Sequence, residues 1–483
     1  CLFDSCDYGM YVWVAQDVAV SNCQFLCPTA IVGRSGIHTS SNSAAPAATA
    51  SFDRFSVKGC TFAGIADPNA AEIYGIHLEG VAGAHFQCSV SGCDFSFIGH
   101  NTSTATKVVA FVSLAPTTSV VHQQPSVINC TYRSITGDVV VNGVHMENVQ
   151  RAVAHGNNFR DLEVSANASV VENSAIRVTY GDMLTITNNI IRGIGDTVQV
   201  LEGGVIHIGD TSQTVQNEVI NVSGNQISLC DHSGSGTYSG ILLEQNAKSL
   251  VVSNNILNAG SNMDKAIYLD GSTGSVRMSN ATVTGNVMRD FFSGIEVDMT
   301  FIGATEGTLA ITGNTIEEFS AQGIDVAGST TITDLIGITI SGNVLRSTLS
   351  AFAIVCNAAN SIAVTGNSVH LSHASAQCEG ITVRQATHGC ISGNTIRIIS
   401  TGITRGIRDT NTSGTGSTYM LIASNQIHLD SANPSSSGIE SAGASTKIYA
   451  NLVVGSANPI KTVTASATQA IGATELNNFA AAP

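Results

Sequence analysis

One short stretch, Asn-Val-Ser-Gly-Asn-Gln-Ile at residues 221–227, recurs along the chain and constrains the fold more than any other feature. Close copies of it end at Ile316, Leu345, Val369 and Ile396. Alternation of apolar and polar residues indicates strands. Gly and Asn tolerate the positive φ angles of a tight corner. Each copy therefore predicts two short strands that meet at Gly-Asn, with Val222 and Ile227 facing inward.

The corner asparagine returns at intervals of about 24 to 37 residues. A repeat of this size cannot close a core alone and must stack on its neighbours, as in a solenoid. If each repeat forms one coil, equivalent side chains lie about 4.8 Å apart and can exchange amide hydrogen bonds. The sequence therefore predicts an internal asparagine ladder. Its members are Asn157, Asn189, Asn225, Asn255, Asn286, Asn314, Asn343, Asn367, Asn394, Asn425 and Asn451.

Cysteine fills the equivalent position nearer the N-terminus, at Cys23, Cys60, Cys93 and Cys130, each followed two residues later by a large aromatic residue. We expect these cysteines to continue the ladder in the first coils as small, buried, reduced residues. The sequence contains no Cys-x-x-C pair, and Cys88 with Cys93 does not match a zinc site. Four Cys and eleven Asn positions predict about 15 coils, or roughly 70 Å of column.

A second motif precedes each corner: a Gly, Ala or Val is followed by an alternating strand whose aliphatic residues at the second and fourth positions point inward. The third and fifth residues then point outward. Examples are Gly143-Val144-His145-Met146-Glu147, Ala266-Ile267-Tyr268-Leu269-Asp270 and Gly294-Ile295-Glu296-Val297-Asp298. With this strand, each coil has three, and the stack has three parallel sheets.

The repeats predict one elongated domain over residues 1–455, followed by an Ala/Thr-rich cap or tail remnant at 456–483. The chain begins without Met or an apolar leader, so we expect a fragment that enters the column midway. Four connections are too long for tight corners and are predicted to line a groove. They are Thr39 to Phe55, Ser113 to Ser126, Asp210 to Val219 and Thr410 to Tyr419.

The charge balance limits the partners of this chain. A formal net charge of −15, with only 20 Lys and Arg, argues against nucleic acid and anionic membranes. It also disfavours a strongly anionic polymer, unless a local basic patch overrides the overall field. No apolar run is long enough for a transmembrane helix, and no motif indicates a cofactor.

The alternation, the Asn corner and the coil length resemble the right-handed parallel β-helix of the pectate-lyase-like superfamily, over roughly residues 1–455. Within it, Gly/Ser/Thr/Asn-rich columns of this style are similar to the tailspikes of bacteriophages, which bind or depolymerise polysaccharides. The resemblance implies an extracellular or virion-tail location, a bacterial capsule or O-antigen polysaccharide as partner, and a homotrimer. The catalytic motifs of polygalacturonases and pectate lyases are missing, so their residue roles do not transfer.

Acidic side chains concentrate on the outward positions of four successive coils. They are Glu244, then Asp270 beside Tyr268, then Glu296 with Asp298, then Asp325. Like charges this close cannot all ionise cheaply, so one carboxyl is expected to stay neutral and act as a general acid.

The predicted carboxyl separation depends on which coils contribute. Asp270 and Asp298, in adjacent coils, would lie about 5 Å apart, as in retaining glycosidases, whereas Glu244 and Asp298 would lie about 9 to 10 Å apart, nearer the inverting distance. We predict a hydrolytic site at Asp270, Glu296, Asp298 and Asp325, with Glu244 and Tyr268 binding substrate. The alternatives are a calcium site made of oxygen ligands and a solvated acidic surface.

A second constellation contains His145, Arg177 and His207 on the same face. A polysaccharide lyase needs a base for the proton α to a uronate and a cation for its carboxylate, and these residues match both requirements. They could instead bind a metal, bind substrate or be hydrogen-bonded surface residues. A non-catalytic shaft or adhesin is the third functional class. Aromatic residues are scarce, at 5%, so we expect polar hydrogen bonds to bind the glycan.

Overall fold

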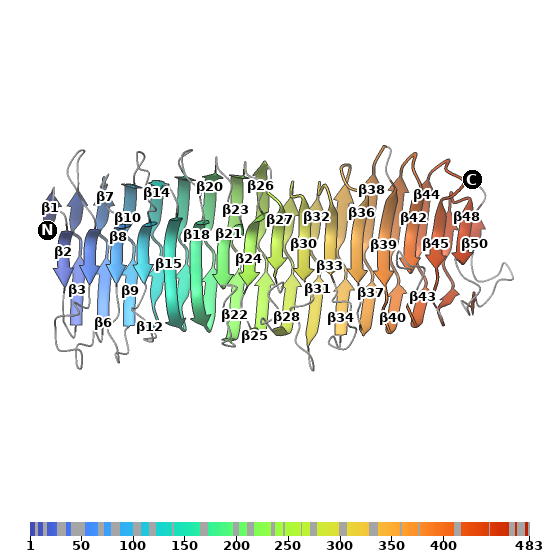
Figure 1. Ribbon diagram of the computed structural model, residues 1–483, viewed down its shortest axis with the longest axis horizontal. Helices are drawn as coiled ribbons and strands as arrows, with labels where there is room; N and C mark the ends of the chain where they lie inside the picture. The colour runs from blue at the N-terminus through green and yellow to red at the C-terminus, as the bar shows by residue number, and fades with distance from the viewer. Residues whose placement is uncertain are drawn as a thin grey trace. The chain divides into compact units, whose positions relative to one another are not determined.

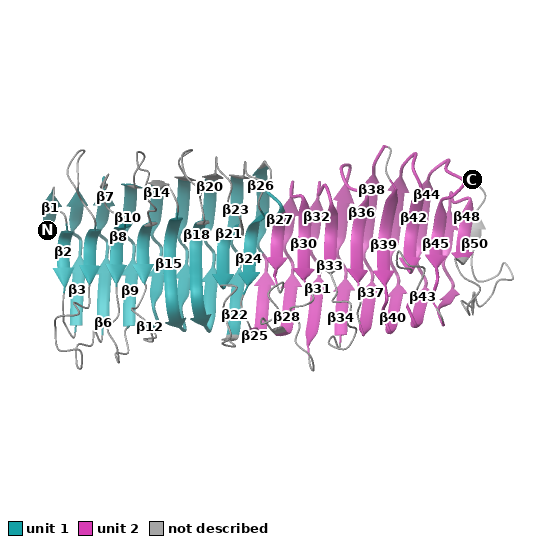
Figure 2. Cartoon of the chain, in the orientation of Figure 1, with its two compact units in different colours: residues 1–246, 255–264 teal, residues 247–254, 265–483 magenta. Residues whose placement is uncertain are grey.

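The structure is a computed structural model in which every strand pairing is parallel and no described residue is helical. The chain is an all-β parallel solenoid with three parallel sheets (Figure 1). It divides into two compact units, which are described separately: residues 1–246 with 255–264, and residues 247–254 with 265–483 (Figure 2). The structure describes residues 1–4, 8–12, 17–26, 35–39, 54–65, 72–78, 87–99, 108–114, 122–137, 140–164, 172–196, 202–209, 217–232, 237–244, 247–261, 263–270, 278–298, 307–327, 337–357, 360–374, 377–409, 417–443, 445–462, 469–470 and 479–481.

Each coil contributes a strand to each sheet, and one coil adds a second short strand, His122–Gln123, to sheet B. Sheet B holds the Gly-Ile strands, sheet C the strands that enter the Asn corner, and sheet A the strands that leave it. Sheet A of the first unit contains β1 (Leu2–Asp4), β4 (Gln24–Leu26), β7 (Thr61–Ala63), β10 (Asp94–Gly99), β14 (Thr131–Gly137), β17 (Asn158–Val164), β20 (Ile190–Asp196), β23 (Gln226–His232) and β26 (Ile256–Ser261). Sheet B of this unit contains β2 (Tyr8–Val12), β5 (Ser35–Thr39), β8 (Glu72–Leu78), β11 (Val108–Leu114), β12 (His122–Gln123), β15 (Val140–Gln150), β18 (Glu172–Asp182), β21 (Glu202–Gly209) and β24 (Thr237–Glu244). Its sheet C contains β3 (Asp17–Ser21), β6 (Arg54–Lys58), β9 (Gln87–Ser91), β13 (Ser126–Ile128), β16 (Val153–His155), β19 (Leu184–Thr187) and β22 (Asn217–Ser223).

The second unit repeats the same arrangement. Its sheet A contains β29 (Val287–Arg289), β32 (Thr315–Glu317), β35 (Val344–Ser347), β38 (Ser368–Ser372), β41 (Thr395–Ile399), β44 (Gln426–Asp430), β47 (Leu452–Val454) and β50 (Phe479–Ala481). Sheet B contains β27 (Lys265–Leu269), β30 (Ser293–Asp298), β33 (Gln322–Ala327), β36 (Phe352–Asn357), β39 (Cys378–Arg384), β42 (Thr404–Asp409), β45 (Ser437–Ser441) and β48 (Asn458–Thr462). Sheet C contains β25 (Ala247–Ser253), β28 (Met278–Thr284), β31 (Thr308–Thr312), β34 (Gly337–Ser341), β37 (Ser361–Thr365), β40 (His388–Ser392), β43 (Tyr419–Ala423), β46 (Lys447–Tyr449) and β49 (Gln469–Ala470).

The predicted asparagine ladder is confirmed within each unit, and every one of its asparagines is buried. In the first unit, Asn225 Nδ2 donates to Asn255 Oδ1 at 2.9 Å and to the carbonyl oxygen of Ile186 at 3.0 Å. Its own Oδ1 accepts from the backbone N–H and from Nδ2 of Asn189, at 3.0 and 2.9 Å. In the second unit the same side-chain bonds run from Asn286 to Asn451.

The corner geometry corrects one detail of the sequence prediction. Only the residue before the ladder asparagine has a positive φ, such as Asn188 at 56° and Gly224 at 66°. The ladder asparagine itself does not. Its side chain is therefore selected for the buried hydrogen bonds, while the preceding position is selected for backbone freedom.

Packing inside the first unit explains the large residues that follow the early cysteines. Six rings stack face to face in consecutive coils, with centroids 4.4 to 5.0 Å apart. They belong to Phe3, Phe25, Phe62, Phe95, Tyr132 and Phe159. The glycine of the Gly-Ile strand makes room for this stack, because a Cβ on Gly143 would lie 2.6 Å from Phe159 Cε1.

Several sequence predictions are not tested by this architecture. The count of about 15 coils, the continuation of the ladder by cysteine, the right-handed sense and the boundary at residue 455 stay predictions. The central parts of the four long connections (residues 40–53, 115–121, 210–216 and 410–416) lie outside the described residues. Within the described part of the chain, no helix is long and apolar enough to cross a membrane.

We predict that Asn225→Ala destabilises the first unit by about 3 kcal/mol or more, because it leaves buried amide and carbonyl groups without partners. Urea unfolding followed by circular dichroism measures this change. Asn258→Ala, which removes an exposed asparagine of sheet A, is the matched control and should change stability by less than about 0.5 kcal/mol. Equal effects of the two substitutions would contradict a stabilising ladder.

Candidate functional site

Three side chains on the outer face of sheet B form a column in the second unit. Strand pairing places Tyr268 of β27 opposite Glu296 of β30, and Glu296 opposite Asp325 of β33. The aliphatic residues on either side of each one point into the core and are fully buried. The strand alternation therefore presents these three polar groups together, as the sequence predicted.

Lys265, at the start of β27, completes this group and was missed by sequence reasoning. Its Nζ lies 2.7 Å from Glu296 Oε1 and 3.3 Å from the centroid of the Tyr268 ring. Lys265 is the only Lys or Arg between Lys248 and Arg277, which is the signal that could have found it. Its ammonium group therefore contacts both the carboxyl group of Glu296 and the aromatic face of Tyr268.

Asp270 follows β27 directly and is 3% exposed. It is hydrogen-bonded to the Tyr268 side chain. Burial raises the pKa of Tyr268, and the carboxylates of Asp270, Glu296 and Asp298 raise it further. Tyr268 is therefore a neutral phenol that can donate one hydrogen bond. The β27–β30 pairing ends at Leu269 and Val297, one residue before Asp270 and Asp298.

Asp325 differs electrostatically from the other acids of the cluster. Burial raises the pKa of Asp325 to about 6, the charge of Glu296 adds to this effect, and Arg384 and Lys265 oppose it. Within the described residues, its Oδ1 is buried without a hydrogen-bond partner. Glu296 and Asp325 are directly opposite each other on neighbouring strands, whose backbones lie about 4.8 Å apart. The two carboxyls therefore have different environments: Glu296 pairs with Lys265, whereas Asp325 protonates in mildly acidic solution.

Glu244 takes part in a different cluster, in the first unit. Its Oε2 lies 2.6 Å from His207 Nε2, and its side chain is almost fully buried. The sequence prediction paired Glu244 with Asp298, but these two residues belong to separate units. Glu244 is therefore not counted in the acidic cluster of the second unit. Sequence alone could not decide whether His207 or Asp298 is the partner of Glu244, because both lie on outward positions of sheet B.

His145, Arg177 and His207 occupy successive positions of one column in the first unit, as predicted. Arg177 is 7% exposed and donates from Nη1 to the carbonyl oxygen of Gly209. Burial lowers the pKa of His145 to about 4, and the positive charge of Arg177 lowers it further. His145 is therefore neutral and a weak base. Among the described residues, no three His, Cys, Asp or Glu side chains are grouped as metal ligands.

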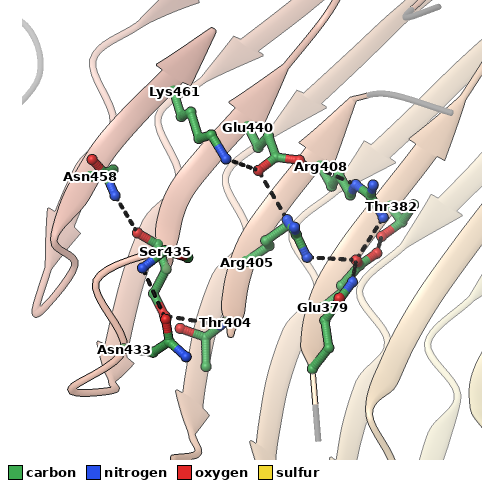
Figure 3. A network of polar contacts seen from close by, with 12 residues as sticks. Glu379, Thr382, Thr404, Arg405, Arg408, Asn433, Ser435, Glu440, Asn458 and Lys461 are labelled. Atoms are coloured by element: carbon green, nitrogen blue, oxygen red, sulfur yellow. Dashed lines mark hydrogen bonds and ion pairs between the residues drawn. The ribbon is translucent and has the colours of Figure 1, made fainter. Parts of the chain in front are cut away.

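A third polar cluster on sheet B of the second unit was also missed by sequence reasoning. Figure 3 shows Arg405 between Glu379 and Glu440, with Arg408 and Lys461 beside them. Arg408 Nη1 donates to Glu379 Oε1 at 2.8 Å, and Arg405 Nε donates to Glu440 Oε2 at 3.0 Å. Burial favours the neutral acid at Glu440, but Arg405 and Lys461 outweigh it and lower its pKa. These carboxylates are matched by cations, unlike the acids around Asp325.

No protein-family model matches the sequence, and neither does any curated protein sequence. The structure is similar to solved bacteriophage tailspike proteins. For tailspike protein 3 of bacteriophage CBA120, the TM-score is 0.42 at 12% identity, and the match covers 85% of this chain and 55% of that one. For a tailspike mutant of the E. coli bacteriophage HK620, in complex with a hexasaccharide, the TM-score is 0.39 at 11% identity. That match covers 89% of this chain and 71% of the other. The chain thus spans about half the length of the first of these proteins, and the likeness concerns the fold alone.

We predict that Asp325→Asn stabilises the protein at pH 7, by up to about 3 kcal/mol for a shift of roughly two pKa units. The folded-state pKa lies above the unfolded value, so the native state binds the proton more tightly. The wild type therefore loses stability as pH rises from about 4 to about 6, whereas the variant does not. Urea unfolding at both pH values measures the difference, and a pH-independent difference would contradict the raised pKa.

We predict that Glu379→Gln destabilises the second unit by about 3 kcal/mol, because Arg405 and Arg408 lose a carboxylate that is fully buried. Asp430→Asn is the matched control, since it breaks the exposed pair with Arg397 and should cost less than about 1 kcal/mol. Thermal unfolding of both variants measures these costs. A loss at Glu379 no larger than that at Asp430 would show that the buried network adds no stability.

Proposed function

We propose that the protein binds a polysaccharide along the outer face of sheet B in the second unit and hydrolyses it at internal linkages. The observation that carries this proposal is the unequal pair of neighbouring carboxyls. Glu296 is paired with Lys265, and the pKa of Asp325 is raised to about 6. Glycosidases need two carboxyl groups whose environments separate their protonation states.

In the proposed reaction, Asp325 is the general acid and Glu296 the nucleophile. The Asp325 proton passes to the glycosidic oxygen as the bond from that oxygen to the anomeric carbon breaks, while Glu296 attacks the anomeric carbon. Water then hydrolyses the glycosyl-enzyme ester, with the Asp325 carboxylate accepting its proton. The adjacent-coil spacing supports this retaining course. Asp298 and Asp270 stabilise the positive charge of the transition state electrostatically.

Substrate binding in this proposal uses the groups that surround the two carboxyls. Lys265 donates hydrogen bonds to sugar hydroxyls, and the Tyr268 oxygen accepts one, because the O–H of Tyr268 is directed to Asp270. The substrate class, a capsule or O-antigen polysaccharide, follows from the sequence resemblance to tailspikes. The virion-tail or extracellular location and the homotrimer belong to the proposal on the same basis.

Two other functions, a polysaccharide lyase and a non-catalytic shaft or adhesin, are alternative outcomes of the depolymerisation experiment. A lyase would use His145 beside Arg177, which strand pairing makes neighbours. However, the lowered pKa of His145 weakens it as a base, and Arg177 already donates to a backbone carbonyl. A shaft or adhesin would bind the glycan without shortening it.

We predict that Glu296→Gln and Asp325→Asn each lower the rate of depolymerisation by a factor of about 100 or more, since each removes one acid–base or nucleophilic function. The measurement is the release of reducing ends from a panel of bacterial capsules and O-antigens. His145→Ala is the control and should retain full activity. Elimination would give product with the ultraviolet absorbance of a conjugated double bond, and loss of activity in His145→Ala would then favour the lyase. If the wild type binds a glycan but releases no reducing ends, the result would favour the non-catalytic shaft or adhesin.

A further inference from the structure

Three arginines lie side by side on the outer face of sheet A in the first unit. Strand pairing places Arg133 of β14 opposite Arg160 of β17, and Arg160 opposite Arg192 of β20. Their backbones are therefore about 4.8 Å apart from one coil to the next. We call these three residues the arginine row. In sequence, each arginine is the third residue after Cys130, Asn157 or Asn189, and it follows a buried residue of the same strand, so strand alternation turns it outward.

The arginine row is solvent-exposed and lacks acidic partners among the described residues. All three side chains are exposed, and no ion pair between described residues involves any of them. Within the described residues, the row makes one weak hydrogen bond, from Arg160 Nε to Asn158 Oδ1 at 3.4 Å. The row is bounded by uncharged Ser96 and Ser228 at the equivalent positions of β10 and β23.

This arrangement opposes the stability of the sheet. Like charges on directly opposite residues of neighbouring strands are destabilising. The chain has only 20 Lys and Arg against 35 Asp and Glu, so acids to neutralise the row are plentiful in the sequence. At the equivalent positions of the second unit, Glu317 lies between Arg289 and Arg346, and Arg397 pairs at 3.6 Å with Asp430, which lies two positions further along the neighbouring strand. Among the described residues of the first unit, no acidic side chain offsets this repulsion, so the row does not contribute to folding stability there.

We propose that the arginine row binds a linear anionic polysaccharide, whose carboxylate or sulfate groups meet successive guanidinium groups. Guanidinium forks bind such groups through two parallel hydrogen bonds, and three in register present a line of charge that matches an extended polyanion. Nucleic acid is disfavoured as the occupant, because the net charge of −15 repels a chain with one charge on every nucleotide. A polysaccharide with charges on only some of its sugars meets less repulsion.

The proposal is tested by binding measurements on the full chain. The probes are polygalacturonate oligomers for carboxylate, dextran sulfate for sulfate, neutral dextran, and single-stranded oligothymidylate. We expect the wild type to bind at least one of the first two. For three neutralised charges, the logarithm of affinity should fall against the logarithm of salt concentration with a slope of about −2. The variant R133Q/R160Q/R192Q should bind about tenfold more weakly or worse at low salt, and its unfolding midpoint should equal or exceed that of the wild type.

The matched control removes the same number of positive charges, three, from sheet C. K58Q/K248Q/K447Q changes three exposed lysines on sheet C and should leave at least half of the affinity. Equal losses in the two triple variants would overturn the proposal, because they would indicate a general effect of net charge. Failure of both anionic glycans to bind better than neutral dextran would also overturn it, as would tighter binding of oligothymidylate.

The arginine row does not depend on the proposed hydrolysis. Binding is measured without turnover, and D298N, in the other unit, should retain the anion affinity of the wild type. Loss of depolymerisation in D298N with unchanged binding to the row would separate the two proposals. Conversely, full depolymerisation of a neutral polymer by R133Q/R160Q/R192Q would leave the hydrolytic proposal intact whatever the result for the row.

Discussion

The buried amide of the ladder asparagine is the interaction on which the rest of the structure depends. Asn225, for example, donates to Asn255 of the next coil and to the carbonyl oxygen of Ile186 in the coil before, and its own oxygen accepts from Asn189. A buried amide without such partners costs roughly 1 to 3 kcal/mol of folding stability. The hydrogen bonds therefore fix the register of each strand against its neighbour, and the register decides which side chains become neighbours on every face. The carboxyls around Asp325 and the arginines around Arg160 are both consequences of it.

Periodic features were predictable from the sequence because their positions recur. Asn225 and Ile227 repeat with the same neighbours, and strand alternation then places Glu296 and Asp325 on one face without further information. The ion-pair partner of an individual charged side chain was not predictable in this way. Glu244 joins His207, and Lys265 joins Glu296, through side-chain reach and local burial, neither of which has a period. The corner also shows this limit, because sequence indicated a Gly-Asn pair but not which of the two residues has the positive φ.

The outer face of sheet B contains two kinds of charged cluster that differ in how completely they are neutralised. Around Arg405, carboxylates and cations alternate, and each buried charge has a partner. Around Asp325, several carboxyls share Lys265, and one buried oxygen lacks a hydrogen bond among the described residues. A neutralised network stabilises a fold, whereas an incompletely neutralised one holds a group away from its ordinary protonation state. This difference is why the acidic cluster, and not the larger network, is the candidate for chemistry.

The sequence interval between ladder asparagines varies while the bond between them does not. It is 24 residues from Asn343 to Asn367 and 36 from Asn189 to Asn225, yet the amide bonds measure 3.0 and 2.9 Å. Insertions and deletions are thus absorbed in the connections and leave the column undisturbed. Such a protein can evolve on two independent scales: it can reshape its exterior one residue at a time, and it can grow or shrink by the gain or loss of entire coils.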